Sequence, residues 1–219
     1  MGKDCYIFGA GEESTPRELP PKNEVLVIAA DGGYPAACRI FGAPDLVVGD
    51  FDSLGYVPEN IELVRHPAEK DETDLFLAVD EGISRGAERF LIYGALGARL
   101  DHTVANLQLL SYLAARGYEA YLFGADGTVV TALGGGFSLT FPAVYRGTLS
   151  VFAVGGPAEE VTLCGPKYSL AGATLTPEFP LGVSNELLGA PATVSLAKGM
   201  LLLFFPQTDG APLPQRNRI

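Results

Sequence analysis

The chain has 219 residues, of which 47% are hydrophobic and 19% charged, with 27 Gly and 16 Pro. This length and composition fit one or two folded domains, and they exclude a disordered tail, which is poor in apolar residues, and a coiled coil, which is poor in Gly and Pro. The net charge of -11 argues against a nucleic-acid binder, which needs a basic surface.

The first part of the sequence alternates between strand and helix patterns. Short apolar runs at 5–8, 25–30, 46–48, 91–93 and 118–123 predict buried parallel strands. Apolar residues at helical spacing predict helices over 73–84 and 102–115, the second ending at Gly117. This alternation indicates an α/β domain with a mostly parallel sheet over residues 1–124.

After residue 124 the pattern changes to short apolar runs separated by Gly and Pro. The runs at 129–133, 138–141, 148–154, 161–164, 173–176, 192–196 and 201–205 predict an all-β sandwich over residues 125–219. By pattern alone, Lys167-Tyr168 and Ser184-Asn185-Glu186 are ordinary turns, and the polar tail from Gln207 is loose.

Sequence features that would place the protein in a membrane or outside the cell are missing. No apolar run approaches the roughly 20 residues that span a bilayer, and the first residues lack the pattern of a signal peptide. The three cysteines are far apart and have no metal-ligand spacing. We therefore expect a cytoplasmic protein that contacts neither membrane nor nucleic acid.

The strongest chemical signal is the acidic segment that follows the predicted strand at 46–48. In an extended chain Asp50 and Asp52 point to the same side, with Phe51 turned the other way. Two carboxylates this close favour a hard cation between them, and Mg²⁺ binds one or two carboxylates together with substrate phosphates. The alternative is a loop in which both Asp side chains form turn hydrogen bonds.

Two further polar segments open the predicted helices. In the first, Asp71 is either a helix cap or part of a metal and phosphate site with Lys70 and Asp74. In the second, the glycines at 94–97 and the planar guanidinium of Arg99 suit a phosphate at a helix N-terminus. The alternatives to a phosphate site in that second segment are that Asp101 caps the helix and that His102 has a structural role.

Two glycine-containing turns complete the pattern. Gly9-Ala10-Gly11 and Asp31-Gly32-Gly33 each follow a predicted strand, and neither fits a P-loop or dinucleotide motif. With the segments at 49–53 and 94–102, they place four glycine-rich or acidic loops after four strands. Ligands bind at the carboxyl ends of such strands in open α/β sheets, so we expect these loops to converge.

The combination of segments resembles the thiamine pyrophosphokinase family. The matching pieces span nearly the entire chain and occur in order: Ala30 to Gly33, Pro44-Asp45 with Gly49 to Ser53, Asp71 with Thr73-Asp74, Gly94 to Gly97 with Arg99 to His102 and Asn106, Gly165 with Lys167-Tyr168, and Ser184-Asn185-Glu186. Two features depart from the family, namely Tyr34-Pro35 in place of Ala-Asn and the absence of tryptophan.

The resemblance implies an α/β catalytic domain over 1–124 that binds ATP and Mg²⁺, followed by a β-sandwich over 125–219 that binds thiamine. It implies transfer of pyrophosphate from ATP to the hydroxyl of thiamine, which gives thiamine diphosphate and AMP. It also implies a homodimer with the active site at the subunit interface.

The resemblance further implies residue roles. The catalytic carboxylates are Asp50, Asp52, Asp71, Asp74 and Asp101, of which Asp50, Asp52 and Asp74 hold the metal and Asp71 or Asp101 takes the alcohol proton. The nucleotide site contains Asp31, Gly32, Gly33, Lys70, Thr73, Arg99, His102 and Asn106. Thiamine contacts Tyr168, Ser184 and Asn185, and Tyr168, Phe179 or another aromatic side chain replaces the stacking tryptophan.

Three other functions fit parts of the sequence. A related pyrophosphokinase for a pterin-like acceptor shares the α/β half, and a glycosyltransferase uses an Asp-x-Asp metal motif such as the one at 50–52. A non-catalytic sensor of nucleotide or thiamine fits the same scaffold.

Overall fold

The computed structural model describes residues 3–51, 54–65 and 71–219. The chain forms two compact units. The first contains Met1–Leu109 and Tyr118–Asp126, and the second contains Leu110–Gly117 and Gly127–Ile219. The assignment of separate ligands to the two halves of the chain stays a prediction.

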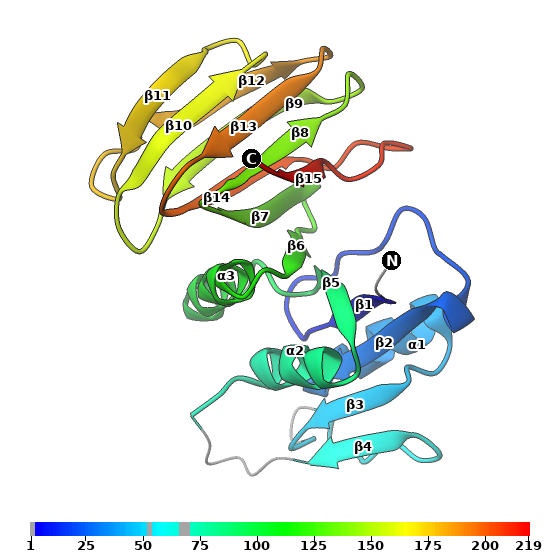
Figure 1. Ribbon diagram of the computed structural model, residues 1–219. Helices are drawn as coiled ribbons and strands as arrows, with labels where there is room; N and C mark the ends of the chain where they lie inside the picture. Colours follow the sequence, from blue (N-terminus) through cyan, green and yellow to red (C-terminus); the bar gives the residue numbers. More distant parts are fainter. Residues whose placement is uncertain (1–2, 52–53, 66–70) are drawn as a thin grey trace. The chain divides into compact units, whose positions relative to one another are not determined.

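The first unit is built on a parallel sheet. Its strands are β1 (Lys3–Phe8), β2 (Val25–Ala30), β3 (Leu46–Gly49), β4 (Glu62–Arg65), β5 (Ala87–Tyr93) and β6 (Glu119–Phe123), in the order β6-β5-β1-β2-β3-β4 (Figure 1). Every residue of β2 is buried, as expected for a parallel strand covered on both faces. The expected α/β fold class is confirmed, and the strand predicted at 25–30 has the predicted bounds.

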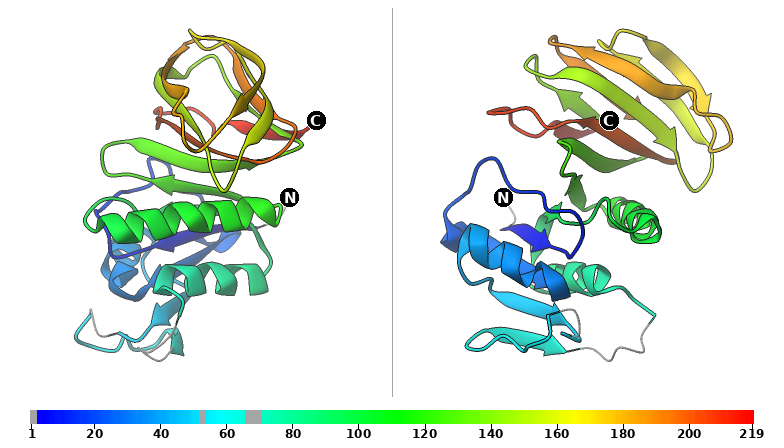
Figure 2. Two further views of the ribbon diagram at one scale, coloured as in Figure 1. Left: turned by 90° about the vertical axis from the view of Figure 1, so that its left-hand side faces the viewer. Right: turned by 180° about the vertical axis from the view of Figure 1, so that it is seen from behind.

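Helices cover both faces of this sheet. They are α1 (Tyr34–Phe41), α2 (Asp74–Ser84) and α3 (Leu100–Ala115), with short 3₁₀ helices η1 (Lys22–Glu24) and η2 (Asp31–Gly33). Figures 1 and 2 show α1 and α2 on opposite faces. The chain moves outward from β1 to β4 and then crosses back through α2 to β5, on the other side of β1. The strand order therefore reverses between β1 and β5, which is where open α/β sheets bind ligands.

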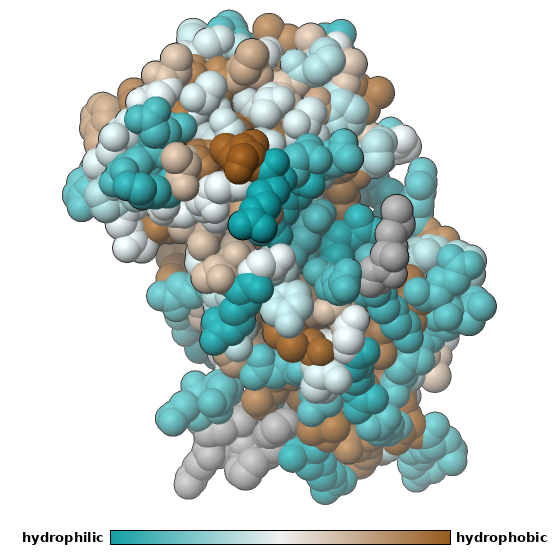
Figure 3. Space-filling view, in the orientation of Figure 1, coloured by the Kyte–Doolittle hydropathy of each residue, from teal (hydrophilic) through white to brown (hydrophobic). Residues whose placement is uncertain are grey.

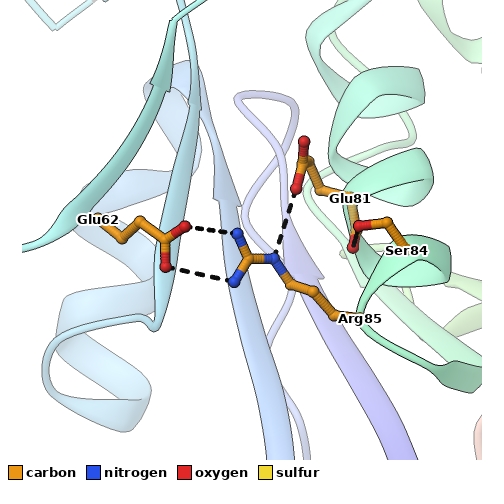
Figure 4. A network of polar contacts seen from close by, with 4 residues as sticks. All are labelled: Glu62, Glu81, Ser84 and Arg85. Atoms are coloured by element: carbon orange, nitrogen blue, oxygen red, sulfur yellow. Dashed lines mark hydrogen bonds and ion pairs between the residues drawn. The ribbon is translucent and has the colours of Figure 1, made fainter.

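The short edge strand β4 is tied to α2 by an arginine. Arg85 donates to both carboxylate oxygens of Glu62, at 2.6 and 3.2 Å, and to Oε2 of Glu81 at 3.4 Å (Figure 4). Ser84 Oγ donates to the carbonyl of Glu81 at 2.8 Å. The hydrogen bonds from Arg85 lower the pKa of Glu62, but solvent screens an exposed pair of this kind, so it contributes little to stability.

The second unit contains antiparallel strands. Four of them, β7 (Thr128–Gly134), β9 (Arg146–Ala153), β12 (Gly182–Leu188) and β14 (Met200–Pro206), follow the order β12-β9-β14-β7. A five-stranded sheet has the order β11-β10-β13-β8-β15, with β8 (Phe137–Phe141), β10 (Ala158–Cys164), β11 (Leu170–Leu175), β13 (Ala192–Leu196) and β15 (Gln215–Arg218). The predicted all-β architecture is confirmed.

Alternating burial gives this unit its core. In β13, Ala192, Val194 and Leu196 are buried, whereas the residues between them are half-buried Thr and Ser. Phe141, Tyr145 and Phe205 pack edge to face in the interior. The surface over the five-stranded sheet accordingly has mostly near-neutral hydropathy in Figure 3.

Four expectations on local structure are corrected. Ser184, Asn185 and Glu186 lie in strand β12 rather than in a turn, and the tail after Gln207 ends in β15, which pairs with β8 instead of being loose. Both α1 and β4 were absent from the expected elements. The described residues contain no helix long and apolar enough to cross a membrane.

Candidate active site

A cavity of about 290 Å³ lies at the reversal point of the parallel sheet. It is formed by the loops that follow β1, β2 and β5 and by the N-terminal parts of α2 and α3. Its lining residues are Gly9, Ala10, Gly11, Ala30, Asp31, Thr73, Asp74, Leu75, Gly94, Ala95, Gly97, Ala98, Arg99, His102 and Asn106. Loops after three of the four expected strands thus meet in one place.

Glycines allow the loops after β1 and β5 to touch through their backbones. A Cβ atom at Gly9 would lie 2.7 Å from the carbonyl oxygen of Gly94, and a Cβ at Gly94 would collide with the carbonyl of Gly9. Gly94 also has a φ of 63°, which most other residues avoid. Backbone groups therefore form much of this wall of the cavity.

Asp31 is the buried charged residue of the cavity. Its side chain is only 6% exposed, and within the described part of the chain its Oδ1 atom has no hydrogen-bond partner. It packs against Gly49, where a Cβ atom would lie 3.0 Å from the Cβ of Asp31. The last residue of β3, directly before Asp50, therefore lies against this part of the cavity wall.

The acidic segment after β3 differs from its expected extended form. Phe51 is buried, with 4% exposure, and the guanidinium of Arg65 lies 5.4 Å from the centre of its ring. However, Phe51 has a φ of 67°, so the backbone is not extended at this residue. The prediction that Asp50 and Asp52 point to the same side assumed an extended backbone, and that assumption is wrong. Asp52 itself, like Lys70, lies outside the described residues.

Helix α2 begins at the cavity. Thr73 is its N-cap, because its Oγ1 accepts a hydrogen bond from the amide of Phe76 at 3.2 Å, and Asp74 lies in the first turn. The alternative in which Asp71 caps this helix is therefore wrong. Asp71 is exposed and does not line the cavity, whereas Thr73 and Asp74 do.

The segment before α3 presents an arginine to the cavity. Arg99 donates to Asp101 through Nε at 3.2 Å and Nη2 at 2.6 Å. These bonds from Arg99 hold the pKa of the Asp101 carboxyl below its usual range, so this carboxylate is a weaker base than an ordinary aspartate. Asn106 is buried and donates a hydrogen bond to the carbonyl of Ala95 at 2.7 Å. This bond ties helix α3 to the loop after β5, and both residues line the cavity.

Gly32 and Gly33 do not line this cavity. A Cβ at Gly33 would collide with the carbonyl of Phe8, so the packing of η2 on β1 requires glycine there. Gly32 lines a second cavity of about 180 Å³ on the other side of the 9–11 loop, together with Ser14 and Arg39. Ser14 belongs to no sequence motif and was not among the expected site residues.

The residues expected to bind thiamine lie in the second unit. Asn185 is buried and its amide is fully engaged: Oδ1 accepts from the amides of Tyr168 and Glu186 at 3.0 and 2.8 Å, and Nδ2 donates to the carbonyl of Tyr168 at 2.7 Å. Tyr168 is 62% exposed, and the ammonium of Lys167 lies 5.7 Å from its ring centre. Ser184 is exposed with a φ of 59°. Asn185 therefore orients the Tyr168 backbone.

The carboxylates suit a hard cation in chemistry. Within residues 3–51, 54–65 and 71–219, no three His, Cys, Asp or Glu side chains lie close enough to hold a metal ion. The unpartnered Oδ1 of Asp31 and the Asp74 carboxylate nevertheless supply oxygen donors in one cavity, and Mg²⁺ prefers such oxygens. The carboxylate oxygens fit Mg²⁺, and no cysteine among the described residues lines the cavity to favour a metal that prefers sulfur.

Comparison with family models gives two matches. Residues 20–122 match the model described as "Thiamin pyrophosphokinase, catalytic domain", and residues 139–201 match "Thiamin pyrophosphokinase, vitamin B1 binding domain". Together the two models cover most of both units.

Individual proteins agree with these models. The chain is 32% identical over 161 residues to a thiamine pyrophosphokinase of Bacillus subtilis. The aligned segment covers 71% of this chain and 75% of that protein. The crystal structure of thiamine pyrophosphokinase from Bacillus subtilis superimposes with a TM-score of 0.77 at 27% identity, covering 93% and 99% of the two chains. A family protein from Enterococcus faecalis gives 0.75 at 28% identity, covering 93% and 98%.

Proposed function

The chain belongs to the thiamine pyrophosphokinase family, and we propose that it transfers the pyrophosphate group of ATP to the hydroxyl of thiamine, producing thiamine diphosphate and AMP. The observation that carries this proposal is the convergence of Asp31, Asp74 and Arg99 on one cavity at the sheet reversal. This combination of carboxylates, a guanidinium and two helix N-termini suits a metal-bound polyphosphate.

The reaction joins the alcohol oxygen of thiamine to the β-phosphorus of ATP and breaks the bond from that phosphorus to the oxygen bridging the α-phosphate. Such transfers ask the protein mainly for positioning and charge neutralisation. Arg99 supplies positive charge for phosphate oxygens, with Lys70 as a second cation. The nucleotide also contacts Thr73 and His102, which line the same cavity, whereas Gly32 and Gly33 do not.

In this proposal Asp50, Asp52 and Asp74 would hold Mg²⁺, and the unpartnered Oδ1 of Asp31 would offer a further oxygen donor. When bound, the ion neutralises charge on the phosphate oxygens. The alcohol proton passes to Asp71 or Asp101, and the hydrogen bonds from Arg99, which lower the pKa of Asp101, make Asp101 a weaker base than an ordinary aspartate. The first unit is thus the catalytic domain in this proposal.

Thiamine is bound by the second unit, through Tyr168 and Ser184, with Asn185 behind them. The cationic thiazolium suits an aromatic face, and Tyr168 is 62% exposed. Exposed apolar side chains of the same unit, Phe179, Leu181 and Val183, support a second subunit here. We therefore propose a homodimer that completes the active site at its interface.

The place of the reaction is the cytoplasm in this proposal. Cys5, Cys38 and Cys164 are all free thiols, which fits a reducing compartment that also supplies ATP.

A product assay tests the activity. The protein is mixed with ATP, Mg²⁺ and thiamine, and the products are identified by mass spectrometry. Equal amounts of thiamine diphosphate and AMP, abolished by a chelator, are expected. Thiamine monophosphate with ADP would contradict pyrophosphate transfer, and no product from a folded, metal-loaded protein would redirect the search to a pterin-like acceptor or to a sensor.

Light scattering tests the assembly. We expect a molar mass twice that of the chain, and we expect Phe179→Asp to shift the protein toward monomer and to reduce the turnover with it. A monomeric wild-type protein with full activity would overturn the interface site.

A further inference from the structure

The first part of the loop after β1, residues 9–12, is joined to the end of β5 and to the cavity loop that follows it. The amide of Gly9 donates to the carbonyl of Tyr93 at 2.8 Å, that of Gly11 to Gly94 at 2.7 Å, and that of Glu12 to Leu96 at 3.3 Å. The two loops are therefore paired beyond the ends of their strands.

Two side chains of the first loop complete this pairing. The buried Ser14 hydroxyl accepts from the amide of Gly94 at 3.1 Å and donates to the carbonyl of Phe123 at 2.7 Å. The carboxylate of Glu12 accepts from the amide of Ala98 at 3.1 Å and packs directly against Gly97. Gly94 and Ala98 line the cavity, whereas neither Glu12 nor Ser14 is among its lining residues.

The hydrogen bond that Glu12 accepts comes from a residue with an unfavourable backbone conformation. Ala98 has a φ of 50° next to Gly97 with a φ of 77°, and a left-handed conformation is unfavourable for alanine. The hydrogen bond from Ala98 to Glu12 fixes the turn from which Arg99 projects. A carboxylate so close to a phosphate site is electrostatically costly, so its presence indicates a positioning role.

We infer that Glu12 and Ser14 are positioning residues for the nucleotide-binding segment 94–99, acting through Ala98 and Gly94 without touching the substrate. This inference rests on the proposed function, because it takes ATP as the occupant of the cavity. A turn that is already ordered before ATP binds avoids the entropy cost of ordering it on binding, so the affinity for ATP is higher.

Glu12 variants test the inference through kinetics. We expect Glu12→Ala to raise the KM for ATP about tenfold, the effect of losing roughly one hydrogen bond to a charged acceptor, with the KM for thiamine unchanged. Glu12→Gln keeps an oxygen acceptor and should remain within about twofold of wild type. Glu13→Ala is the matched control, because Glu13 pairs with Arg39 instead, at 2.6 Å.

Amide hydrogen exchange without substrates provides a second measurement. Glu12→Ala should speed exchange at Ala98, and Ser14→Ala should speed it at Gly94, with rescue by Ser14→Thr. The inference is overturned if exchange at Ala98 is unchanged, if Glu12→Gln is as impaired as Glu12→Ala, or if Glu12→Ala lowers the KM for ATP, which would make Glu12 a competitor of phosphate. A wild-type protein without activity would refute the proposed function, while the exchange rates would still test the positioning.

Discussion

The buried carboxylate of Asp31 costs the folded protein free energy, because one of its oxygens lacks a hydrogen-bond partner among the described residues. Such a cost is expected at a site built for a ligand. Asparagine tolerates the left-handed backbone that Asp31 adopts, with a φ of 42°. We therefore expect Asp31→Asn to leave the melting temperature equal or higher while lowering turnover by at least tenfold, measured by calorimetry and the product assay.

Asp45 provides the control for this prediction. Its carboxylate accepts from the amide of Val27 at 2.8 Å and pairs with the ammonium of Lys22 at 2.6 Å. Asp45→Asn should therefore destabilise the protein, by about 0.5–1.5 kcal/mol, and leave turnover unchanged. If Asp31→Asn destabilises as much as Asp45→Asn, the missing partner of Asp31 has no functional meaning.

The Arg99–Asp101 pair makes a prediction about protonation. Because hydrogen bonds from Arg99 lower the pKa of Asp101, Arg99→Gln should return that pKa toward its ordinary value. The carboxyl then takes up a proton at a higher pH than in wild type, which carbon NMR of the side chain detects. Glu62 should titrate as before in this variant, because its partner is Arg85. An unchanged Asp101 titration would show that the pair is not formed in solution.

At the scale of elements, strand β12 carries a side chain that shapes another segment. The Asn185 amide holds Tyr168 through two hydrogen bonds and accepts a third from the amide of Glu186. We expect Asn185→Ala to raise the KM for thiamine several-fold and leave the KM for ATP unchanged, because only the Tyr168 backbone loses its support. It should also destabilise the protein by about 1–3 kcal/mol, since buried polar groups remain unpaired.

Ser184→Ala is the comparison for Asn185. Its exposed side chain faces solvent, so its loss should leave stability unchanged while still raising the KM for thiamine. A rise in the KM for ATP in either variant would contradict the assignment of this strand to thiamine.

Sequence patterns predicted the elements that have strong internal periodicity. The strands at 25–30 and 192–196 have the predicted bounds, because each is an apolar or alternating run with a clear end. Strand β15 was missed, since Gln215–Arg218 contains no apolar residue and is stabilised by pairing with β8 and by Arg216 over the ring of Phe137. Helix α1 is short and buries only Ala37, which leaves too little periodicity to recognise.

The sequence allowed us to predict which loops form the site, but not which contacts hold those loops together. Sequence reasoning identified Asp31, Thr73, Asp74 and Arg99, which the fold brings to one cavity. It had no means of finding Ser14, because a single serine in a loop has no periodicity or spacing, and its role depends on which strand ends lie next to each other.

For the molecule as a whole, strand order makes the site. β1 lies between β2 and β5, so the chain reverses direction across the sheet at β1 and leaves the carboxyl ends open to a ligand. Composition and periodicity predict strands but not their neighbours, and this adjacency comes from the crossover through α2. The same topology buries the aromatic rings of Phe8, Tyr93 and Phe123 in a stacked row.

Burial of ionisable groups in both units predicts sensitivity to alkaline pH. Burial raises the pKa of Cys5 and Tyr93 in the first unit, and it raises the pKa of Tyr145 in the second unit from 10.0 to about 12. In the unfolded chain a tyrosine ionises near pH 10, whereas folded Tyr145 keeps its proton until about pH 12. Its contribution to stability is therefore complete below about pH 10 and is lost as the pH rises from there toward 12.

Tyr145→Phe separates this effect from the hydrogen bond of the same side chain. The hydroxyl donates to the carbonyl of Pro212 at 3.1 Å, so the variant should unfold at a lower temperature than wild type at pH 8. Its melting temperature should then fall less steeply between pH 9 and 11, because the group that resists ionisation is gone. Tyr168→Phe, at an exposed ring, should follow the wild-type curve. Parallel curves for wild type and Tyr145→Phe would show that the phenol of Tyr145 ionises as readily in the folded protein as in the unfolded chain.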